Sequence, residues 1–105
     1  MPKKKSPYYL EISQEVKSEI DRLPGNIRQR VKRLILQLLD NPYPPETKEL
    51  STADGKPLGV YRIKIDTWRL VYLPNDDLLI VELLKVGRKH GPEFYDSVLA
   101  RLGVE

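Results

Sequence analysis

Hydrophobic and polar residues alternate in two short runs, VYRIKI and WRLVYL, which Asp66 and Thr67 join. Successive side chains of an extended strand point to opposite faces, so Arg62 and Lys64 share one face of the first run. A two-residue turn at Asp66 and Thr67 pairs the runs so that Arg69 lies opposite Lys64. The pattern therefore predicts a β-hairpin with basic side chains gathered on one face.

This arrangement of cations has two interpretations. Like charges opposite each other destabilise a strand pair, so packing alone does not favour Lys64 opposite Arg69. A bound anion would stabilise the pair. The alternative is the solvated polar face of a sheet whose other face is buried, and the spacing alone leaves both open.

The first half of the chain predicts one strand and two helices. Residues 8–12 are aromatic and β-branched, which suits a short strand. Ser13 is placed to cap a helix that ends at Pro24-Gly25, and Asn26 is placed to cap a second helix that the prolines after Asn41 end. Apolar residues recur at helical spacing in both segments: Val16, Ile20 and Leu23, then Ile27, Val31, Leu34, Ile35 and Leu38.

The second half predicts the hairpin, one more strand and a last helix. Residues 46–57 are polar and predict a connection without regular structure. Residues 78–86 are almost continuously apolar, as in a central strand covered on both faces. Gly91-Pro92 opens the last helix, in which Phe94, Val98 and Leu102 are spaced to pack on the sheet. The predicted fold is α+β, a single compact domain of order β-α-α-β-β-β-α with a mostly antiparallel four-stranded sheet flanked by helices.

Composition sets the limits of this interpretation. The chain has 105 residues, which suits one domain, and no cysteine, which excludes disulfides and thiolate metal sites. Residues 1–7 are basic and lack the apolar core of a signal peptide, so we expect a short arm before a domain of residues 8–105 and a cytoplasmic protein. No apolar run is long enough to cross a membrane. The net charge of +3 favours acidic partners, either nucleic acid or protein.

Residues 61–95 contain an ordered set of short motifs. The motifs are Tyr61-Arg62-Ile63-Lys64, Trp68-Arg69-Leu70-Val71-Tyr72, Asn75-Asp76-Asp77, Val86-Gly87-Arg88-Lys89 and Glu93-Phe94-Tyr95. This set resembles the RelE branch of the RelE/ParE toxin superfamily, and with the helical first half the resemblance covers roughly residues 8–102. The resemblance implies a toxin of a type II toxin–antitoxin system that cleaves mRNA in the ribosomal A site.

The chemistry of such a cleavage fits the residues present. A 2′-hydroxyl can attack its own phosphorus without metal if cations neutralise the phosphorane and two protons are moved. Because His90 is the single histidine, a histidine pair is excluded. We expect no cofactor and no metal ligand. The resemblance assigns catalytic roles to Lys64, Arg69, Lys89 and Tyr95, and RNA binding to Arg62, Arg88 and His90.

Several of these positions also have a second interpretation of their role. Lys89 stands where the family commonly has arginine, and neighbouring Arg88 is a possible substitute. Tyr95 could instead be a core aromatic residue, and His90 either a solvated side chain or an acid–base group. The basic residues of the second helix form either a solvated face or a surface for ribosomal RNA: Arg28, Arg30, Lys32 and Arg33.

The resemblance also implies partners. These are an acidic RelB-like antitoxin, the 70S ribosome and mRNA, with operator DNA bound through the antitoxin and no membrane. The main rival is a ParE-like toxin of the same fold that inhibits DNA gyrase and is not a nuclease. Such a toxin has no need for basic residues and a tyrosine to converge, so their convergence distinguishes the two.

Overall fold

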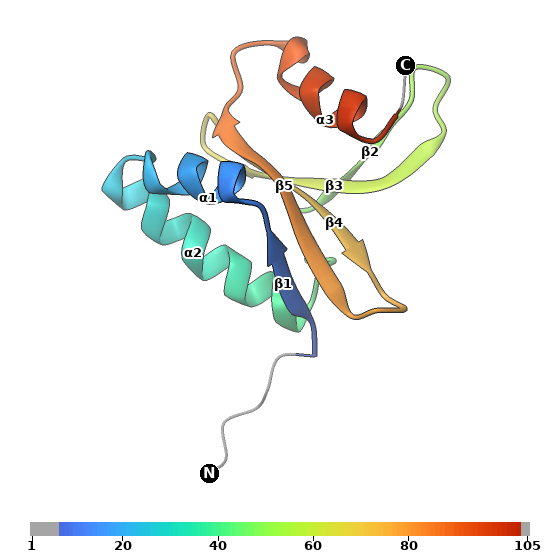
Figure 1. The fold of residues 1–105 in the computed structure, drawn as a ribbon. Coiled ribbons are helices and arrows are strands. Elements are labelled where there is room, and N and C mark those ends of the chain that lie inside the picture. The colour runs from blue at the N-terminus through green and yellow to red at the C-terminus, as the bar shows by residue number, and fades with distance from the viewer. Residues whose placement is uncertain (1–6, 104–105) are drawn as a thin grey trace.

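The computed structural model describes residues 7–103, which begin with a short edge strand and a helical hairpin (Figure 1). The basic arm predicted for residues 1–7 lies, except for Pro7, outside this range. As predicted, Ser13 caps the first helix, its Oγ accepting a hydrogen bond from the Val16 amide at 3.2 Å. The elements are β1 (Tyr9–Ile12), α1 (Gln14–Asp21) and α2 (Gly25–Asp40).

The start of α2 differs from the prediction. Asn26 is not the cap, because the helix begins at Gly25 and Asn26 lies in its first turn. Pro24 takes the cap position with an extended backbone, φ −52° and ψ 144°, and its carbonyl accepts the Arg28 amide at 2.8 Å. Proline fixes φ close to this value, so the backbone turns into the helix without a side-chain cap. None of the helices in residues 7–103 is long and apolar enough to cross a membrane.

The sheet has five strands, one more than predicted. The additional strand is β2, within the segment expected to be a polar connection, and it pairs antiparallel with β3. It forms the edge of a sheet of order β1-β5-β4-β3-β2, in which only β1 and β5 run parallel. The remaining strands are β2 (Lys48–Ser51), β3 (Pro57–Ile65), β4 (Trp68–Asn75) and β5 (Ile80–Arg88).

The predicted hairpin register is confirmed. Lys64 pairs with Arg69 and Ile65 with Trp68 across the turn. The apolar run predicted as the central strand is β5, which is interior but lies second from the edge, while β4 occupies the middle. The start of that run, Leu78 and Leu79, belongs to the β4–β5 turn and is exposed.

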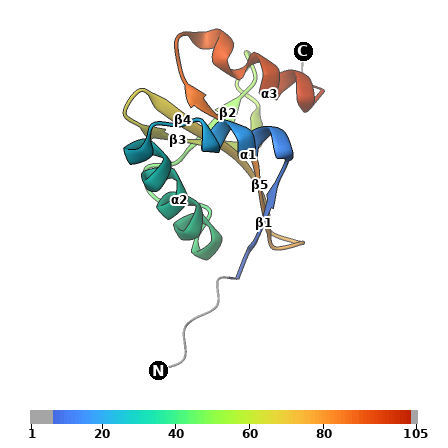
Figure 2. The same cartoon turned by 60° about the vertical axis from the view of Figure 1, so that its left-hand side comes forward.

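Helices cover both faces of the sheet, and each face has its own buried cluster (Figures 1 and 2). On one face α1 and α2 pack against a large cluster that includes Val16, Leu38, Leu70 and Tyr72. On the other, the last helices cover a smaller one: Val60, Val71, Leu84, Phe94 and Val98. The larger cluster carries most of the hydrophobic stabilisation, because buried apolar area sets that free energy.

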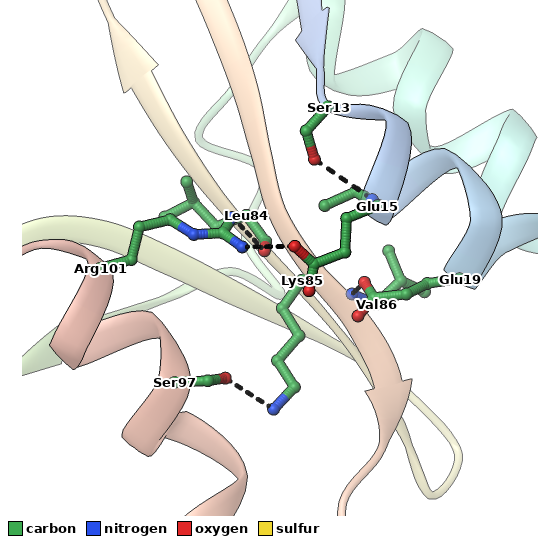
Figure 3. Close-up of polar contacts among 9 residues, drawn as sticks. Ser13, Glu15, Glu19, Leu84, Lys85, Val86, Ser97 and Arg101 are labelled. Carbon is green, nitrogen blue, oxygen red and sulfur yellow. Dashed lines mark hydrogen bonds and ion pairs between the residues drawn. The ribbon is translucent and has the colours of Figure 1, made fainter.

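The predicted last helix is two short pieces, the 3₁₀ helix η1 (Pro92–Tyr95) and α3 (Asp96–Arg101). A register shift in β4–β5 leaves Leu84 without a partner in β4, and Leu84 and neighbouring Lys85 both meet these helices. Figure 3 shows the polar contacts there: Lys85 Nζ donates to Ser97 Oγ at 3.0 Å, and Arg101 donates to the Leu84 carbonyl at 3.1 Å.

Tyr72 ties the middle strand to the loop after α2. Its side chain is fully buried, and its hydroxyl donates to the Pro42 carbonyl at 2.6 Å and lies within hydrogen-bond distance of Thr47 Oγ1. Burial raises the pKa of Tyr72 to about 12, so the phenol stays protonated at neutral pH. The contact fixes the chain just before β2.

We predict that Tyr72→Phe lowers the free energy of unfolding by about 1–2 kcal/mol, because the Pro42 carbonyl loses its donor in a buried place. Urea unfolding followed by circular dichroism measures the change. Tyr43→Phe is the matched control, since the Tyr43 hydroxyl bonds exposed Asp76. Equal stability of Tyr72→Phe and the wild type would contradict the role given to this hydroxyl.

Candidate active site

The cations predicted from the hairpin lie together on the face of the sheet that α3 covers in part. Arg62 pairs with Val71, a member of the smaller cluster on that face, and Lys64 pairs with Arg69. Arg62 and Arg69 are half-buried, whereas Lys64 is exposed. Alternation of side chains along β3 and β4 is therefore sufficient to bring these three groups together.

Lys89 and Tyr95 complete this cluster from the end of β5 and from η1. Lys89 Nζ lies 5.4 Å from the centre of the Tyr95 ring, and the Lys89 amide donates to the Thr67 carbonyl at 3.0 Å. Tyr95 packs its ring against Phe94, with ring centres 5.1 Å apart and planes at 90°. Tyr95 is thus partly core, as one interpretation predicted, and still half-exposed beside Lys89.

Gly87 makes room for this end of the cluster. It pairs with Arg69, and a Cβ built on it would lie 3.3 Å from Cε1 of Phe94. A larger residue would press on the side chain of Phe94, which lies in η1 next to Tyr95. The glycine of the Val86-Gly87-Arg88-Lys89 motif therefore has a packing reason.

Lys48 joins the cluster although the sequence prediction did not include it among the site residues. It lies on β2, paired with Arg62, and is exposed. The signal that would have placed it there is the pairing of β2, which the polar composition of residues 46–57 concealed. Cations from β2, β3, β4 and the end of β5 are thus close enough to Lys64 to act on its charge.

The pKa of Lys64 is lowered from its usual value by this surrounding charge. Arg62 is the largest cause and Arg69 the second, followed by desolvation and then by Lys48 and Lys89. A lowered pKa means a larger neutral fraction of the amine at a given pH, so Lys64 is better suited to accept a proton than an isolated lysine.

Arg69 is held by backbone carbonyls of its own hairpin. Its Nη1 donates to the Asp66 carbonyl at 2.9 Å and to the Trp68 carbonyl at 3.0 Å. Its Nε is buried without a hydrogen-bond partner among the described residues. The guanidinium is therefore fixed on one side and keeps donors for an anion on the other.

Arg88 lies apart from the cluster. Arg88 stacks over Trp68 at 5.8 Å, on the face that α1 and α2 cover, so it does not stand in for Lys89 in this structure. His90 is exposed and lines a groove of about 380 Å³ with Glu19 and Phe94. Residues 7–103 hold no group of three His, Cys, Asp or Glu side chains that could bind a metal.

The basic residues of α2 do not form one surface. Arg30 pairs with Asp66 at 2.8 Å, and Arg28 donates to the Asp21 and Leu23 carbonyls. Arg33 lines a groove of about 330 Å³ between α2 and β3, which Lys64 also lines. The basic side chains of α2 therefore have separate surroundings, and α2 packs on the face of the sheet opposite the cationic cluster.

A protein-family comparison matches residues 10–90 to the ParE toxin of the type II toxin–antitoxin system parDE. The mRNA interferase toxin RelE of Escherichia coli K12 is 26% identical over 97 residues, covering 90% of this chain and 97% of that protein. A Methanocaldococcus jannaschii protein named as a RelE toxin is 30% identical over 84 residues, covering 80% of this chain and 92% of its own length. The chain belongs to the RelE/ParE family of type II toxin–antitoxin toxins.

Solved structures agree on the fold. A mutant of E. coli RelE in the free state matches with a TM-score of 0.73 at 23% identity, covering 91% of this chain and 98% of that one. RelE of the archaeal RelE–RelB complex from Pyrococcus horikoshii matches with a TM-score of 0.67 at 21% identity, covering 80% and 97%. The α+β architecture predicted from the sequence is thereby confirmed.

We predict that Lys64→Gln raises the thermal unfolding midpoint, and more so at low salt. The lowered pKa of Lys64 means that its protonated form is disfavoured in the folded protein, so loss of that charge stabilises the fold at neutral pH. Lys56→Gln is the control, because Lys56 is an exposed lysine that is not among the charges acting on Lys64. Thermal unfolding at low and high salt measures both, and equal shifts would contradict the prediction.

Proposed function

We propose that this toxin is an endoribonuclease that cleaves mRNA in the ribosomal A site and so inhibits translation. The observation that carries the proposal is the convergence of Arg62, Lys64, Arg69, Lys89 and Tyr95 on one face. Relatives named mRNA interferases support it. A cationic cluster whose central lysine has a lowered pKa suits a reaction that develops negative charge on phosphorus.

The proposed reaction is attack of a 2′-hydroxyl on the adjacent phosphorus. The O2′–P bond forms and the P–O5′ bond breaks, giving a 2′,3′-cyclic phosphate and a 5′-hydroxyl. Neutral Lys64 takes the proton of the 2′-hydroxyl, and Arg69 stabilises the charge of the phosphorane with its remaining donors. Arg62 binds the phosphate chain, and Tyr95 stacks on a base.

Lys89 is the better candidate for protonating the leaving 5′-oxygen. Its charge acts on Lys64 and its amine lies 5.4 Å from the centre of the Tyr95 ring, whereas His90 is not among the groups that act on Lys64. His90 and Arg88 therefore retain at most a role in binding RNA outside the reacting phosphate. No step of this reaction needs a metal or a cofactor.

The proposed partners follow from the charge and the family. An acidic RelB-like antitoxin would meet a basic toxin with a net charge of +3 and bind with electrostatic assistance. Solved relatives include RelE toxins in complex with RelB antitoxins, from E. coli and from P. horikoshii. The toxin–antitoxin complex would bind operator DNA through the antitoxin. Co-purification with the product of the neighbouring reading frame tests the partnership.

The rival is inhibition of DNA gyrase, since the family comparison names a ParE toxin. Induction of the toxin followed in time separates the two functions. Loss of intact mRNA before any fall in DNA replication supports the nuclease. Gyrase–DNA cleavage complexes with intact mRNA would overturn it. We also expect little cutting of free RNA by the purified protein, because the ribosome presents the message.

We predict that Arg69→Ala lowers the single-turnover rate on ribosome-bound mRNA by about 10²–10³, because it removes a donor to the transition state. Arg69→Lys should recover only part of this rate, since lysine keeps the charge and loses the planar guanidinium. Lys17→Ala is the control, a cation of α1 remote from the cluster. Wild-type cleavage by folded Arg69→Ala would refute the site.

We predict a pH dependence set by Lys64. Cleavage should rise with pH until the pKa of Lys64 is passed, because the neutral amine accepts the proton. Since Arg62 is the largest cause of the lowered pKa, Arg62→Gln should move this rise to higher pH, while Arg62→Lys keeps it in place. Single-turnover rates at saturating toxin measure the profile. An unmoved profile in Arg62→Gln would contradict the assignment of Lys64 as the base.

A further inference from the structure

The turn between β3 and β4 makes hydrogen bonds to both Arg69 and Lys89 of the candidate site. The Asp66 carbonyl accepts Nη1 of Arg69 at 2.9 Å, and the Thr67 carbonyl accepts the amide of Lys89 at 3.0 Å. Two consecutive carbonyls therefore hold the guanidinium of Arg69 and the backbone of Lys89, just after the end of β5. A shift of this turn would move both groups together.

The side chain of Asp66 ties this turn to α2. Its Oδ2 lies 2.8 Å from Nη1 of Arg30, and the two side chains are 68% and 43% exposed, respectively. An ion pair this exposed contributes little to the free energy of folding. It nevertheless joins the two-residue turn to a helix of 16 residues packed on the core.

The backbone at Asp66 restricts which residue can serve there. Its φ is 57°, in the left-handed region, where aspartate, asparagine and glycine are the residues best tolerated. Asparagine would keep this conformation and remove the charge, and glycine would keep the conformation and remove the whole contact. Both substitutions change the ion pair while leaving the turn able to form.

From these contacts we infer that Arg30 and Asp66 are positioning residues for Arg69 and Lys89, acting through the Asp66-Thr67 turn. This inference rests on the proposed ribonuclease function. Neither residue touches the reacting phosphate. Arg30 holds Asp66, and the carbonyls of the turn hold the groups that meet the RNA.

The direction in which Asp66→Asn changes the cleavage rate separates a positioning role from a general electrostatic effect. Asp66 is a carboxylate beside a cluster that binds a polyanion, so on charge alone Asp66→Asn should leave RNA cleavage unchanged or raise it. A positioning role predicts the opposite result. We expect the single-turnover rate of Asp66→Asn to fall on the order of 10-fold, with little change in the toxin concentration needed for saturation, because misplaced catalytic groups slow the chemical step. Asp66→Gly should fall at least as far.

Arg33 supplies the matched control for Arg30. It lies one turn further along α2, lines the groove that Lys64 also lines, and carries the same charge. Arg30→Gln should slow cleavage well beyond Arg33→Gln, and Arg30→Lys should recover most of the loss. The double variant Arg30→Gln with Asp66→Asn should be no slower than the worse single variant, because both break one contact. Equal effects of Arg30→Gln and Arg33→Gln, or additive losses in the double variant, would overturn the inference.

A second readout does not depend on catalysis. The Nε–H of Arg69 is buried and should exchange slowly with solvent in the wild type. In Asp66→Asn and Arg30→Gln its exchange, followed by NMR, should become faster, while Arg33→Gln leaves it unchanged. Unchanged exchange in the first two variants would overturn the positioning role even if cleavage slows. If the wild type cuts no RNA, the ribonuclease proposal fails, and the exchange rates still decide whether the ion pair positions Arg69.

Discussion

The two-residue turn at Asp66-Thr67 is the constraint on which the rest of the candidate site depends. It fixes the register of β3 against β4, and a slip of one residue would send Lys64 or Arg69 to the opposite face. The same turn accepts hydrogen bonds from the Arg69 side chain and the Lys89 backbone. This turn therefore determines that Lys64 and Arg69 lie on the same face, and it orients the Arg69 side chain.

Grouping these cations opposes folding, and the stability must come from elsewhere in the sheet. The helical hairpin buries a large apolar cluster on one face, with Leu38, Leu70 and Tyr72 fully enclosed. The opposite face has a smaller cluster under η1 and α3, which leaves room beside it for polar side chains. The division explains how one face of the sheet provides most of the buried core while part of the other remains open for the RNA that we propose as substrate.

Much of this arrangement could be predicted from sequence because it depends on local rules. Strand alternation and a two-residue turn give the pairing of Lys64 with Arg69, and the cap at Ser13 follows from its side chain. Strand β2 was missed because its four residues carry little apolar signal, and its pairing depends on a partner distant in the chain. Lys48 was left out of the site for the same reason.

Other differences have equally specific causes. Side chains alternate at the end of β5, so Arg88 lies at Trp68 and Lys89 at Tyr95, on opposite faces of the sheet. The sequence prediction treated the two neighbours as interchangeable and did not apply this alternation to them. Asn26 had the right residue type for a cap, but the fixed backbone of Pro24 starts the helix earlier. The contact between Arg30 and Asp66 joins two elements whose relative placement only the packed core determines.

The most direct test of the ribonuclease account is the chemistry of the cut ends. Ribosomes stalled on a defined message are incubated with the purified toxin, and the ends of both fragments are identified. Attack by a 2′-hydroxyl predicts a cut within the A-site codon, with a 2′,3′-cyclic phosphate on the upstream fragment and a 5′-hydroxyl on the downstream one. Fragments with a 5′-phosphate, or a message left uncut on the ribosome, would contradict the account.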